Sequence, residues 1–233
     1  MPAALSYSAK GPRQINQDYI LSSEFDDKHS IFIVSDGIGG YEYGEIAAEV
    51  AAASVSGFFS AKPDLISVEE TLHKLSIQIC LKLMAKASEL KCVRLGTTIA
   101  AAYFFDNHAL LFWIGDTRIY HYRNGQLLFQ STDHSMIYEM KAGGSIITPF
   151  IRDQYSHIVT RSLSNEKVVL FDFEQTTLNQ GDHIIICSDG VHNIVPESML
   201  INLVNTQPLS LQPLVEYCTD QARDNFSIIV INI

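Results

Sequence analysis

The stretch Ile31-Phe32-Ile33-Val34-Ser35-Asp36-Gly37 returns in nearly the same form as Ile184-Ile185-Ile186-Cys187-Ser188-Asp189-Gly190. Each apolar run is short, rich in β-branched residues and followed by a turn residue, which predicts two buried strands. An aspartate at the end of a buried strand costs free energy unless another group pairs with it. The repeated ending therefore predicts two neighbouring strands that present carboxylates to one shared cation site.

The patterns around these two runs predict an α+β fold. Apolar segments bounded by turn residues predict strands at 3–9, 18–24, 30–35, 97–105, 109–114, 119–122, 127–130, 169–174, 183–187 and 226–231. Apolar residues spaced by three and four predict helices from about residue 42 to 59 and at 68–91, 134–142, 197–204 and 210–222. This order lacks the regular alternation of a parallel sheet, so we expect antiparallel sheets sandwiched by helices.

Local signals support several of these boundaries. Ser67 followed by Glu70 fits a capping box at the start of the second helix. Asn124-Gly125 is the strongest hairpin signal in the chain. Residues 145–167 show no clear period, so we interpret them as a flap that could contact a partner.

Composition limits the class of protein. The chain has 233 residues, of which 47% are hydrophobic and 18% charged, and no linker-like segment divides it, so we expect one domain over 1–233. The net charge of −10 argues against nucleic acid and against an anionic membrane surface as partners. Part of this acidity would be neutralised if it gathers around bound cations.

Cysteine usage and the N-terminal residues indicate a compartment. Cys80, Cys92, Cys187 and Cys218 form no CxxC pair, so we expect reduced thiols in a cytoplasmic protein. The first residues show no basic patch followed by an apolar stretch, and no apolar run approaches the length of a membrane span.

Five aspartates stand at strand ends or in tight turns: Asp18, Asp36, Asp116, Asp189 and Asp224. No histidine or cysteine cluster accompanies them, and sites built from oxygen ligands alone select hard cations such as Mg²⁺ or Mn²⁺. A single Asp-Gly pair at a strand end is more often a simple turn. The two Ser-Asp-Gly endings, together with Gly115-Asp116 and Asp224-Asn225, favour a metal site.

Two hard cations roughly 4 Å apart, bridged by a carboxylate, can activate a water and clamp a phosphoryl group. Such a site needs a cationic group for the remaining phosphate oxygens. Arg13 lies in a polar stretch just before Asp18, and its planar guanidinium can bind two oxygens at once. The plainer interpretation of Arg13 is a solvated surface residue.

Other motifs favour a structural interpretation. The glycines between Gly37 and Gly44 do not fit a dinucleotide or P-loop spacing, so we expect a turn into the first helix. His134 and His192 are more often structural than proton shuttles in such settings. No His/Asp partners accompany Ser35 or Ser188, which argues against a serine-nucleophile hydrolase.

Six motifs follow one another along the chain: Arg13-x-x-Asn16-Gln17-Asp18, Ser35-Asp36-Gly37-Ile38-Gly39-Gly40, Gly96-Thr97-Thr98, Gly115-Asp116-Thr117-Arg118, Gly181-Asp182 through Ser188-Asp189-Gly190, and Asp224-Asn225. In this order they resemble the motifs of metal-dependent protein phosphatases of the PPM class, also called type 2C. Each motif alone is weak, but the six span nearly the whole chain.

The resemblance implies a four-layer α-β-β-α sandwich, with two mostly antiparallel sheets flanked by pairs of helices. It implies hydrolysis of phosphoserine and phosphothreonine by direct attack of a water that bridges two Mn²⁺ or Mg²⁺ ions, without a phosphoenzyme. The partners would be proteins that a Ser/Thr kinase has phosphorylated.

The resemblance also implies the metal ligands. Asp36 would bridge the two ions, and the carbonyl of Gly37 would bind one of them. Asp189 and Asp224 would hold the other ion. Asp116 with Asp189 would form a third, weaker site, as in bacterial members.

The remaining roles implied by the resemblance concern the substrate and the support of the ligands. Arg13 would hold the substrate phosphate, so that Arg13, Asp36 and Asp189 form the catalytic set. Gln17, Asp18 and Asn225 would support the metal ligands from behind.

Two positions depart from the family pattern. Gln17 stands where the family often has glutamate, and an amide keeps an acceptor oxygen but removes a charge. Ile38 stands where animal members carry a histidine. Gln17 favours the alternative of a catalytically weak, pseudophosphatase-like module that binds phosphoproteins, whereas the retained aspartates favour an enzyme.

Overall fold

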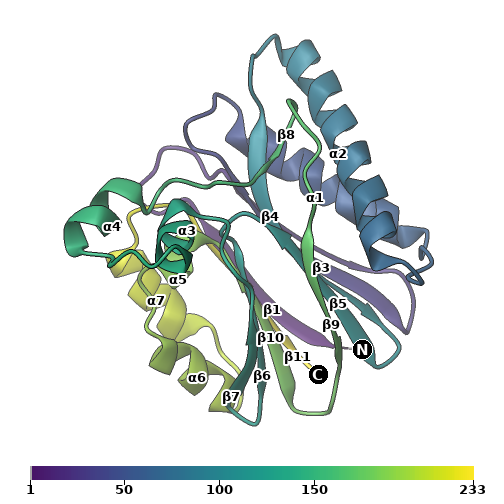
Figure 1. The fold of residues 1–233 in the computed structure, drawn as a ribbon. Coiled ribbons are helices and arrows are strands. Elements are labelled where there is room, and N and C mark those ends of the chain that lie inside the picture. Colours follow the sequence, from purple (N-terminus) through teal and green to yellow (C-terminus); the bar gives the residue numbers. More distant parts are fainter. Residues whose placement is uncertain (1) are drawn as a thin grey trace.

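The computed structural model describes residues 2–233, whose strands form two antiparallel sheets (Figure 1). One sheet has the order β1-β11-β10-β6-β7, and the other has the order β2-β3-β4-β5-β9, with the short β8 beside β4. The strands are β1 (Ala3–Ala9), β2 (Asp18–Glu24), β3 (His29–Gly37), β4 (Gly96–Phe105), β5 (His108–Ile114), β6 (Arg118–Arg123), β7 (Gln126–Gln130), β8 (Leu163–Ser164), β9 (Asp172–Thr177), β10 (Asp182–Cys187) and β11 (Phe226–Asn232).

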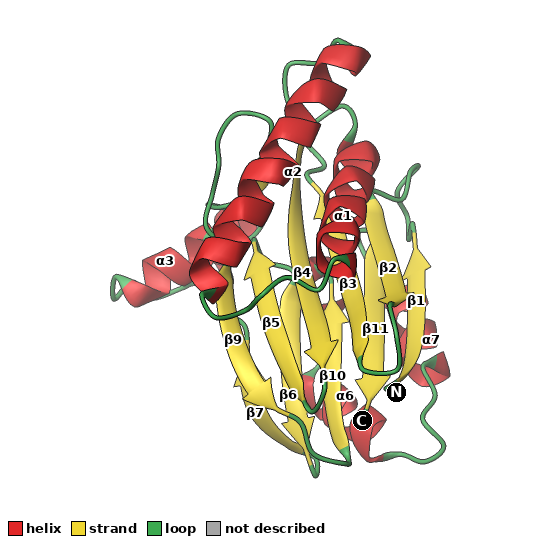
Figure 2. Ribbon diagram, turned by 90° about the vertical axis from the view of Figure 1, so that its right-hand side faces the viewer, coloured by secondary structure: helices red, strands yellow, loops and turns green. Residues whose placement is uncertain are grey.

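Helices cover the outer face of each sheet (Figure 2). Apolar side chains of α1 and α2 pack on the sheet that contains β3, and those of α6 and α7 pack on the sheet that contains β10. The helices are α1 (Gly44–Ser60), α2 (Val68–Leu90), α3 (Met136–Ala142), α4 (Pro149–Tyr155), α5 (Asp189–His192), α6 (Glu197–Asn205) and α7 (Gln212–Gln221). The expected α-β-β-α sandwich is confirmed.

The central strands have apolar middle residues because both of their faces are covered there. In β3, Ile31 and Ile33 pack against the helical layer, whereas Phe32 and Val34 pack between the two sheets. The same alternation runs along β10 and β11. Successive side chains of a strand point to opposite faces, so a strand between two apolar layers needs apolar residues at every position.

Several local predictions are confirmed. The Ser67 hydroxyl accepts a hydrogen bond from the Glu70 backbone N–H, which starts α2 as the capping box predicts. Asn124 and Gly125 both have positive φ angles, of 50° and 73°, and join β6 to β7 in a tight hairpin.

The prediction that the two Ser-Asp-Gly endings lie on neighbouring strands is wrong. β3 and β10 belong to different sheets. Their ends still meet, because the sheets stack face to face and both strands finish at the same end of the sandwich. The two endings also differ in conformation, since Asp36 remains within β3 whereas Asp189 is the first residue of α5.

The segment before β9 also differs from the prediction. A strand was expected at 169–174, but β9 covers Asp172–Thr177 and pairs with β5. Val169 and Phe171 pack into the core beneath α2, and the Ser76 hydroxyl of α2 donates a hydrogen bond to the Val169 carbonyl. Apolar alternation here reflects contacts with a helix, not pairing in a sheet.

The expected flap at 145–167 has its own secondary structure, the helix α4 and the short strand β8. α4 begins with Thr148 as its cap, whose hydroxyl accepts a hydrogen bond from the Ile151 N–H. No helix among residues 2–233 combines the length and apolarity needed to cross a membrane.

Candidate metal centre

Aspartates from five separate segments gather at one end of the sandwich. Asp36 stands near the end of β3, and Asp18 pairs with it across the sheet at the start of β2. Asp116 lies in the turn between β5 and β6, Asp189 starts α5, and Asp224 directly precedes the segment that enters β11. The chain therefore brings together acids that are more than two hundred residues apart.

A cleft of about 240 Å³ opens at this end of the molecule. Asp36, Asp116, Asp189 and Asp224 line it together. Asp18 is not part of the lining, and its side chain is buried. A strand of one sheet and segments that adjoin strands of the other thus contribute carboxylates to a single concave surface.

The glycines of the two Ser-Asp-Gly motifs allow close backbone contacts around the cleft. A Cβ atom on Gly37 would lie 2.2 Å from the carbonyl oxygen of Gly44, and one on Gly190 would lie 1.9 Å from that of Asn225. Only glycine fits at such distances. The sequence after Asp36 is therefore a turn that leads into α1, as expected.

The serines of the two motifs form buried hydrogen bonds between neighbouring segments. The Ser188 hydroxyl donates to Oδ2 of Asp18 at 2.7 Å and accepts from the Ser227 N–H at 3.0 Å. The Ser35 hydroxyl donates to the carbonyl of Thr98 at 2.8 Å. Both hydroxyls are buried and engaged, which fits the rejection of a serine nucleophile.

Burial raises the pKa values of the clustered carboxyl groups. The pKa of Asp116 rises to about 7, and those of Asp18 and Asp189 rise to about 6. Burial and the neighbouring carboxylates raise the pKa of Asp36 well above its ordinary value. Like charges gathered in a site of low polarity favour a bound proton or a bound cation.

The donor set of the cleft fits a hard divalent cation. Its acidic groups are four aspartates, with Arg13 and the exposed His157 beside them, and oxygen ligands suit Mg²⁺ and Mn²⁺. Oδ1 of Asp18 is buried and has no hydrogen-bond partner among residues 2–233. Among residues 2–233, no three His, Cys, Asp or Glu side chains stand close enough together to hold a metal ion as they are placed, so the carboxylates around the cleft would have to turn toward a bound ion.

Arg13 reaches the same carboxylates. Its Nη2 atom donates to Oδ2 of Asp224 at 2.7 Å, and both side chains are substantially exposed. The loop that carries Arg13 is tied down by Asn225, whose amide donates to the carbonyls of Lys10 and Ile15. The Asn225 side-chain oxygen in turn accepts from the Gln17 N–H.

Gln17 lies between the cleft and the start of α1. Its amide nitrogen points to Oε2 of Glu45 at 3.5 Å and packs against Gly44. A glutamate at this position could not donate such a hydrogen bond. The side-chain amide of Gln17 is therefore a suitable partner for Glu45 in the first turn of α1.

His134 and His192 support the backbone around Asp116. Nδ1 of His134 accepts from the Gly115 N–H at 2.9 Å, and Nε2 of His192 donates to the Asp116 carbonyl at 2.8 Å. Burial lowers the pKa of both rings, that of His192 to about 4, so both stay neutral at pH 7. Neither ring lines the cleft, in keeping with the structural role expected for them.

Sequence reasoning missed part of the lining. His157 and Val159, which follow α4, line the cleft with the aspartates, and Thr98 also contributes. Thr98 stands in the Gly-Thr-Thr motif, but the motif gave it no role. The sequence around His157 shows no apolar periodicity from which its position could be predicted. That position depends on contacts with distant elements.

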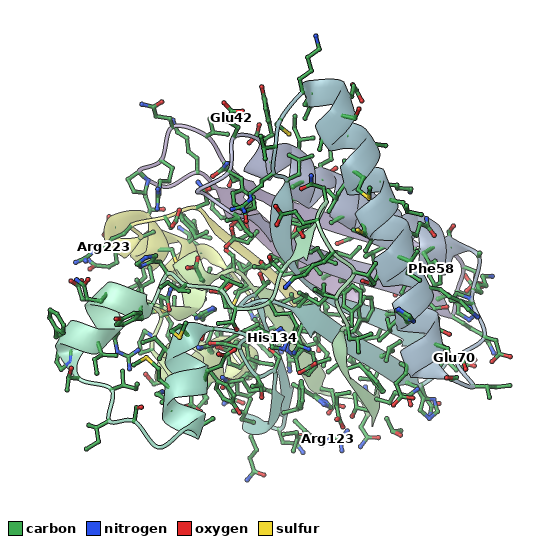
Figure 3. All side chains as sticks on the ribbon, turned by 45° about the horizontal axis from the view of Figure 1, so that its top comes forward. Glu42, Phe58, Glu70, Arg123, His134 and Arg223 are labelled. Carbon is green, nitrogen blue, oxygen red and sulfur yellow. The ribbon has the colours of Figure 1, made fainter. Side chains whose placement is uncertain are left out.

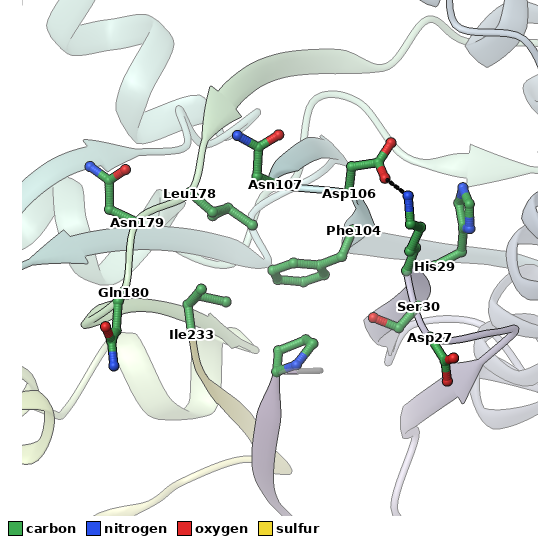
Figure 4. A pocket seen from close by; sticks show the side chains of 12 residues that line it. Asp27, His29, Ser30, Phe104, Asp106, Asn107, Leu178, Asn179, Gln180 and Ile233 are labelled. Atoms are coloured by element: carbon green, nitrogen blue, oxygen red, sulfur yellow. Dashed lines mark hydrogen bonds and ion pairs between the residues drawn. The ribbon is translucent and has the colours of Figure 1, made fainter.

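A second cavity, of about 320 Å³, lies at the opposite end of the sandwich, near both termini (Figures 1 and 4). Apolar side chains of Phe104, Leu178 and Ile233 form part of its wall, and an ion pair of Lys28 with Asp106 stands at its edge. Because no cluster of carboxylates lines it, this cavity is not a candidate for the metal centre.

Comparison with known proteins agrees with this geometry. The family model described as protein phosphatase 2C matches residues 7–225. A serine/threonine phosphatase stp from Listeria welshimeri is 30% identical over 203 residues, covering 84% of this chain and 79% of the relative. The crystal structure of the serine/threonine phosphatase Stp1 from Staphylococcus aureus has a TM-score of 0.86, with 23% identity over 100% of this chain and 95% of that one.

A further solved structure is the catalytic domain of the serine threonine protein phosphatase PstP in complex with two manganese ions. It has a TM-score of 0.83 and 23% identity, and the match covers 99% of this chain and 97% of that one. The fold is thus shared over the full described length. With the family model covering nearly all of the sequence, the chain belongs to the protein phosphatase 2C family of metal-dependent protein phosphatases.

Proposed function

We propose that this chain removes phosphate from phosphoserine and phosphothreonine in proteins, at the carboxylate cleft and with Mn²⁺ or Mg²⁺ bound there. The observation that carries the proposal is the convergence of four aspartates, from β3, α5 and two connecting segments, on one cleft. Their raised pKa values indicate that the ionised carboxylates repel one another in the cleft, and a bound cation would relieve this repulsion.

Four residues would hold the two principal ions. Asp36 would bridge them, the Gly37 carbonyl would bind one ion, and Asp189 and Asp224 would bind the other. Asp116 lies on the same cleft and would form a third, weaker site with Asp189. Divalent ions bound here would lower the pKa of a water for attack on phosphorus and neutralise charge on the phosphoryl group.

The other residues would bind substrate and fix the ligands. Arg13 lies beside Asp224 at the edge of the cleft, where its guanidinium would bind two phosphoryl oxygens. Asn225 and Gln17 would hold the Arg13 loop and the start of α1 in place. Asp18, which accepts from Ser188, would support Asp36 from the neighbouring strand.

The relatives support the cofactor and the substrate class that we propose. PstP, which shares the fold, was solved with two manganese ions, and the Listeria relative is named a serine/threonine phosphatase. We extend these features to this chain, with phosphoproteins made by a Ser/Thr kinase as partners. The free cysteines of the described residues suit the reducing cytoplasm, and we propose one phosphatase domain over residues 1–233.

The test is hydrolysis of p-nitrophenyl phosphate and of a phosphothreonine peptide, with Mn²⁺ added and then removed by EDTA. We expect turnover of both substrates that depends on the metal. The absence of Mn²⁺-dependent turnover of either substrate would refute the proposal. The pseudophosphatase alternative, which Gln17 favours, predicts phosphopeptide binding without turnover. It is not favoured, since Asp36, Asp189 and Asp224 all line the cleft.

A further inference from the structure

A groove of about 660 Å³ opens directly beside the metal centre. It lies between α4 and the end of α7 and shares His157, Asp189 and Asp224 with the carboxylate cleft. A polypeptide with its phosphorylated residue in the cleft would therefore extend into this groove. The groove is large enough for side chains on one side of the phosphorylated residue.

The arginines of the chain show an uneven pattern of ion pairs. Five of the seven pair with a carboxylate: Arg13 with Asp224, Arg94 with Glu166, Arg118 with Asp133, Arg123 with Asp182, and Arg161 with Asp172. Within residues 2–233, Arg152 and Arg223 have no carboxylate at ion-pair distance. Both of them line the groove.

The two arginines come from opposite walls. Arg152 stands on α4, and Arg223 follows the end of α7, just before Asp224. Figure 3 shows Arg223 beside α4, on the side of the molecule where α4 and α7 lie together in Figure 1. Both side chains are exposed, so a ligand that enters the groove can reach them.

The other charged groups of the groove limit what it would accept. Asp153 stands on α4, and Asp189 and Asp224 stand at the end shared with the cleft. Arg13 pairs with Asp224, and the proposed metal ions would neutralise both carboxylates at that end. Two unpaired guanidinium groups then face the one remaining carboxylate, that of Asp153, so the groove is net positive in a protein whose net charge is −10.

A guanidinium binds a carboxylate or a phosphate through two parallel hydrogen bonds. We propose that Arg152 and Arg223 determine substrate specificity by binding an anionic side chain close to the phosphorylated residue. The occupant of the groove is a phosphoprotein segment that carries a glutamate, an aspartate or a second phosphate. This inference rests on the proposed phosphatase function and adds the sequence class of its substrates.

The test compares three phosphothreonine peptides that differ at one neighbouring position, which carries glutamine, glutamate or a second phosphothreonine. That position is placed in turn at each site within about three residues of the phosphate, which covers roughly 10 Å of extended chain on either side. The wild-type kcat/KM should be roughly three- to tenfold higher for an anionic residue than for glutamine at one or more of these sites. The glutamate and diphosphorylated peptides show which anion is preferred.

The double variant Arg152→Gln, Arg223→Gln should lose this preference while it hydrolyses p-nitrophenyl phosphate at the wild-type rate. Arg94→Gln removes one positive charge outside the groove and should keep the preference. Equal wild-type kcat/KM for all peptides would overturn the inference, and so would a preference that survives the double variant. In both cases, turnover of p-nitrophenyl phosphate would leave the proposed function intact.

A binding measurement makes the test independent of turnover. A fluorescent peptide with a phosphonate in place of the phosphate should bind the wild type more tightly when it carries glutamate instead of glutamine. The double variant should bind both peptides equally, and added salt should reduce the difference in the wild type. If no peptide is hydrolysed, the proposed function fails while this comparison still decides the role of the two arginines.

Discussion

At the scale of single residues, the carboxyl of Asp189 has two opposed effects. Burial and the nearby Asp224 raise its pKa to about 6, so its charge destabilises the metal-free fold near neutral pH. The same charge would hold a cation. A residue that lowers stability in one state and is needed in another is expected at a functional site.

Asp189→Asn tests both effects of the Asp189 charge, on stability and on cation binding. The substitution keeps the shape of the side chain but removes the charge, so kcat/KM with Mn²⁺ should fall by at least about 100-fold. The melting temperature of the metal-free protein should stay the same or rise. Asp220→Asn, on the exposed face of α7, is the control and should change neither quantity. Activity near the wild-type level would contradict the role of Asp189.

Arg13→Ala tests whether the Arg13 side chain binds the substrate phosphate. Arg13 would bind the phosphoryl group in both the ground state and the transition state, so its loss should chiefly raise KM. Steady-state kinetics with p-nitrophenyl phosphate at saturating Mn²⁺ measure this change. An unchanged KM would count against the assigned role, and Arg13→Lys should recover only part of the loss because lysine lacks the planar fork.

At the scale of the elements, the contact of α5 with the segment before β11 leaves the least room for a side chain. Gly190→Ala would place a Cβ atom 1.9 Å from the Asn225 carbonyl oxygen, so we expect a loss of about 2–4 kcal/mol in the free energy of unfolding. Gly57→Ala is the matched control, because an added Cβ meets nothing within 4 Å and the residue lies within α1. It should stabilise the protein by about 0.5–1 kcal/mol in a urea titration. Equal effects of the two substitutions would contradict this account.

The pairing of β6 with β10 contains a buried charge network. Burial alone would raise the pKa of Asp182, but hydrogen bonds from Arg123, the Asn179 N–H and His121 lower it to about 2. A lowered pKa in the fold gives stability that is present above the unfolded pKa, near 4, and is lost as the pH falls toward 2.

Asp182→Asn should therefore cost about 2–3 kcal/mol at pH 7, and its difference from the wild type should shrink between about pH 4 and pH 2. Chemical denaturation at several pH values measures this difference. Arg94→Gln, which breaks an exposed pair, should change stability by at most about 0.5 kcal/mol. A difference that does not depend on pH would exclude the ionised form of Asp182 as its cause.

How far the sequence predicts each element depends on how local its determinants are. β1 and β2 have the predicted bounds, and the start of α2 follows from Ser67 and Glu70 alone. The strand expected at 169–174 fails because the apolar residues there pack under α2, which no local pattern reveals. The cap of α4, Thr148 followed by Pro149, was a usable signal that the prediction overlooked.

At the scale of the whole molecule, local sequence patterns predict the aspartates of the candidate site, but they do not predict how these aspartates meet or which residues lie beside them. The five aspartates are identifiable because each stands at a break in an apolar pattern. Their approach across two facing sheets depends on pairings between distant strands, which the order of elements leaves open. His157, Arg152 and Arg223 stand in segments without a period, so only the folded chain places them beside the cleft.

Metal removal should show itself in the stability of the entire protein. The raised pKa values of Asp18, Asp116 and Asp189 mean that ionisation destabilises the metal-free fold as the pH rises from about 4 to about 7. Mn²⁺ at about 100 times its Kd should raise the melting temperature by about 5–10 °C at pH 8. The increase should be smaller at pH 5.5, because protons compete for the same oxygens. EDTA should reverse it, and a melting temperature insensitive to Mn²⁺ at pH 8 would contradict a site in this cleft.

The carboxylates of the cleft come from strands and connections of both sheets, whereas the far end of the sandwich has the hairpin of Asn124 and Gly125. Cations bound in the cleft would link the two sheets to each other at one end only. A chelator should then speed amide hydrogen exchange at the ends of β3 and β10 near the cleft, and leave β6 and β7 near their hairpin as protected as before.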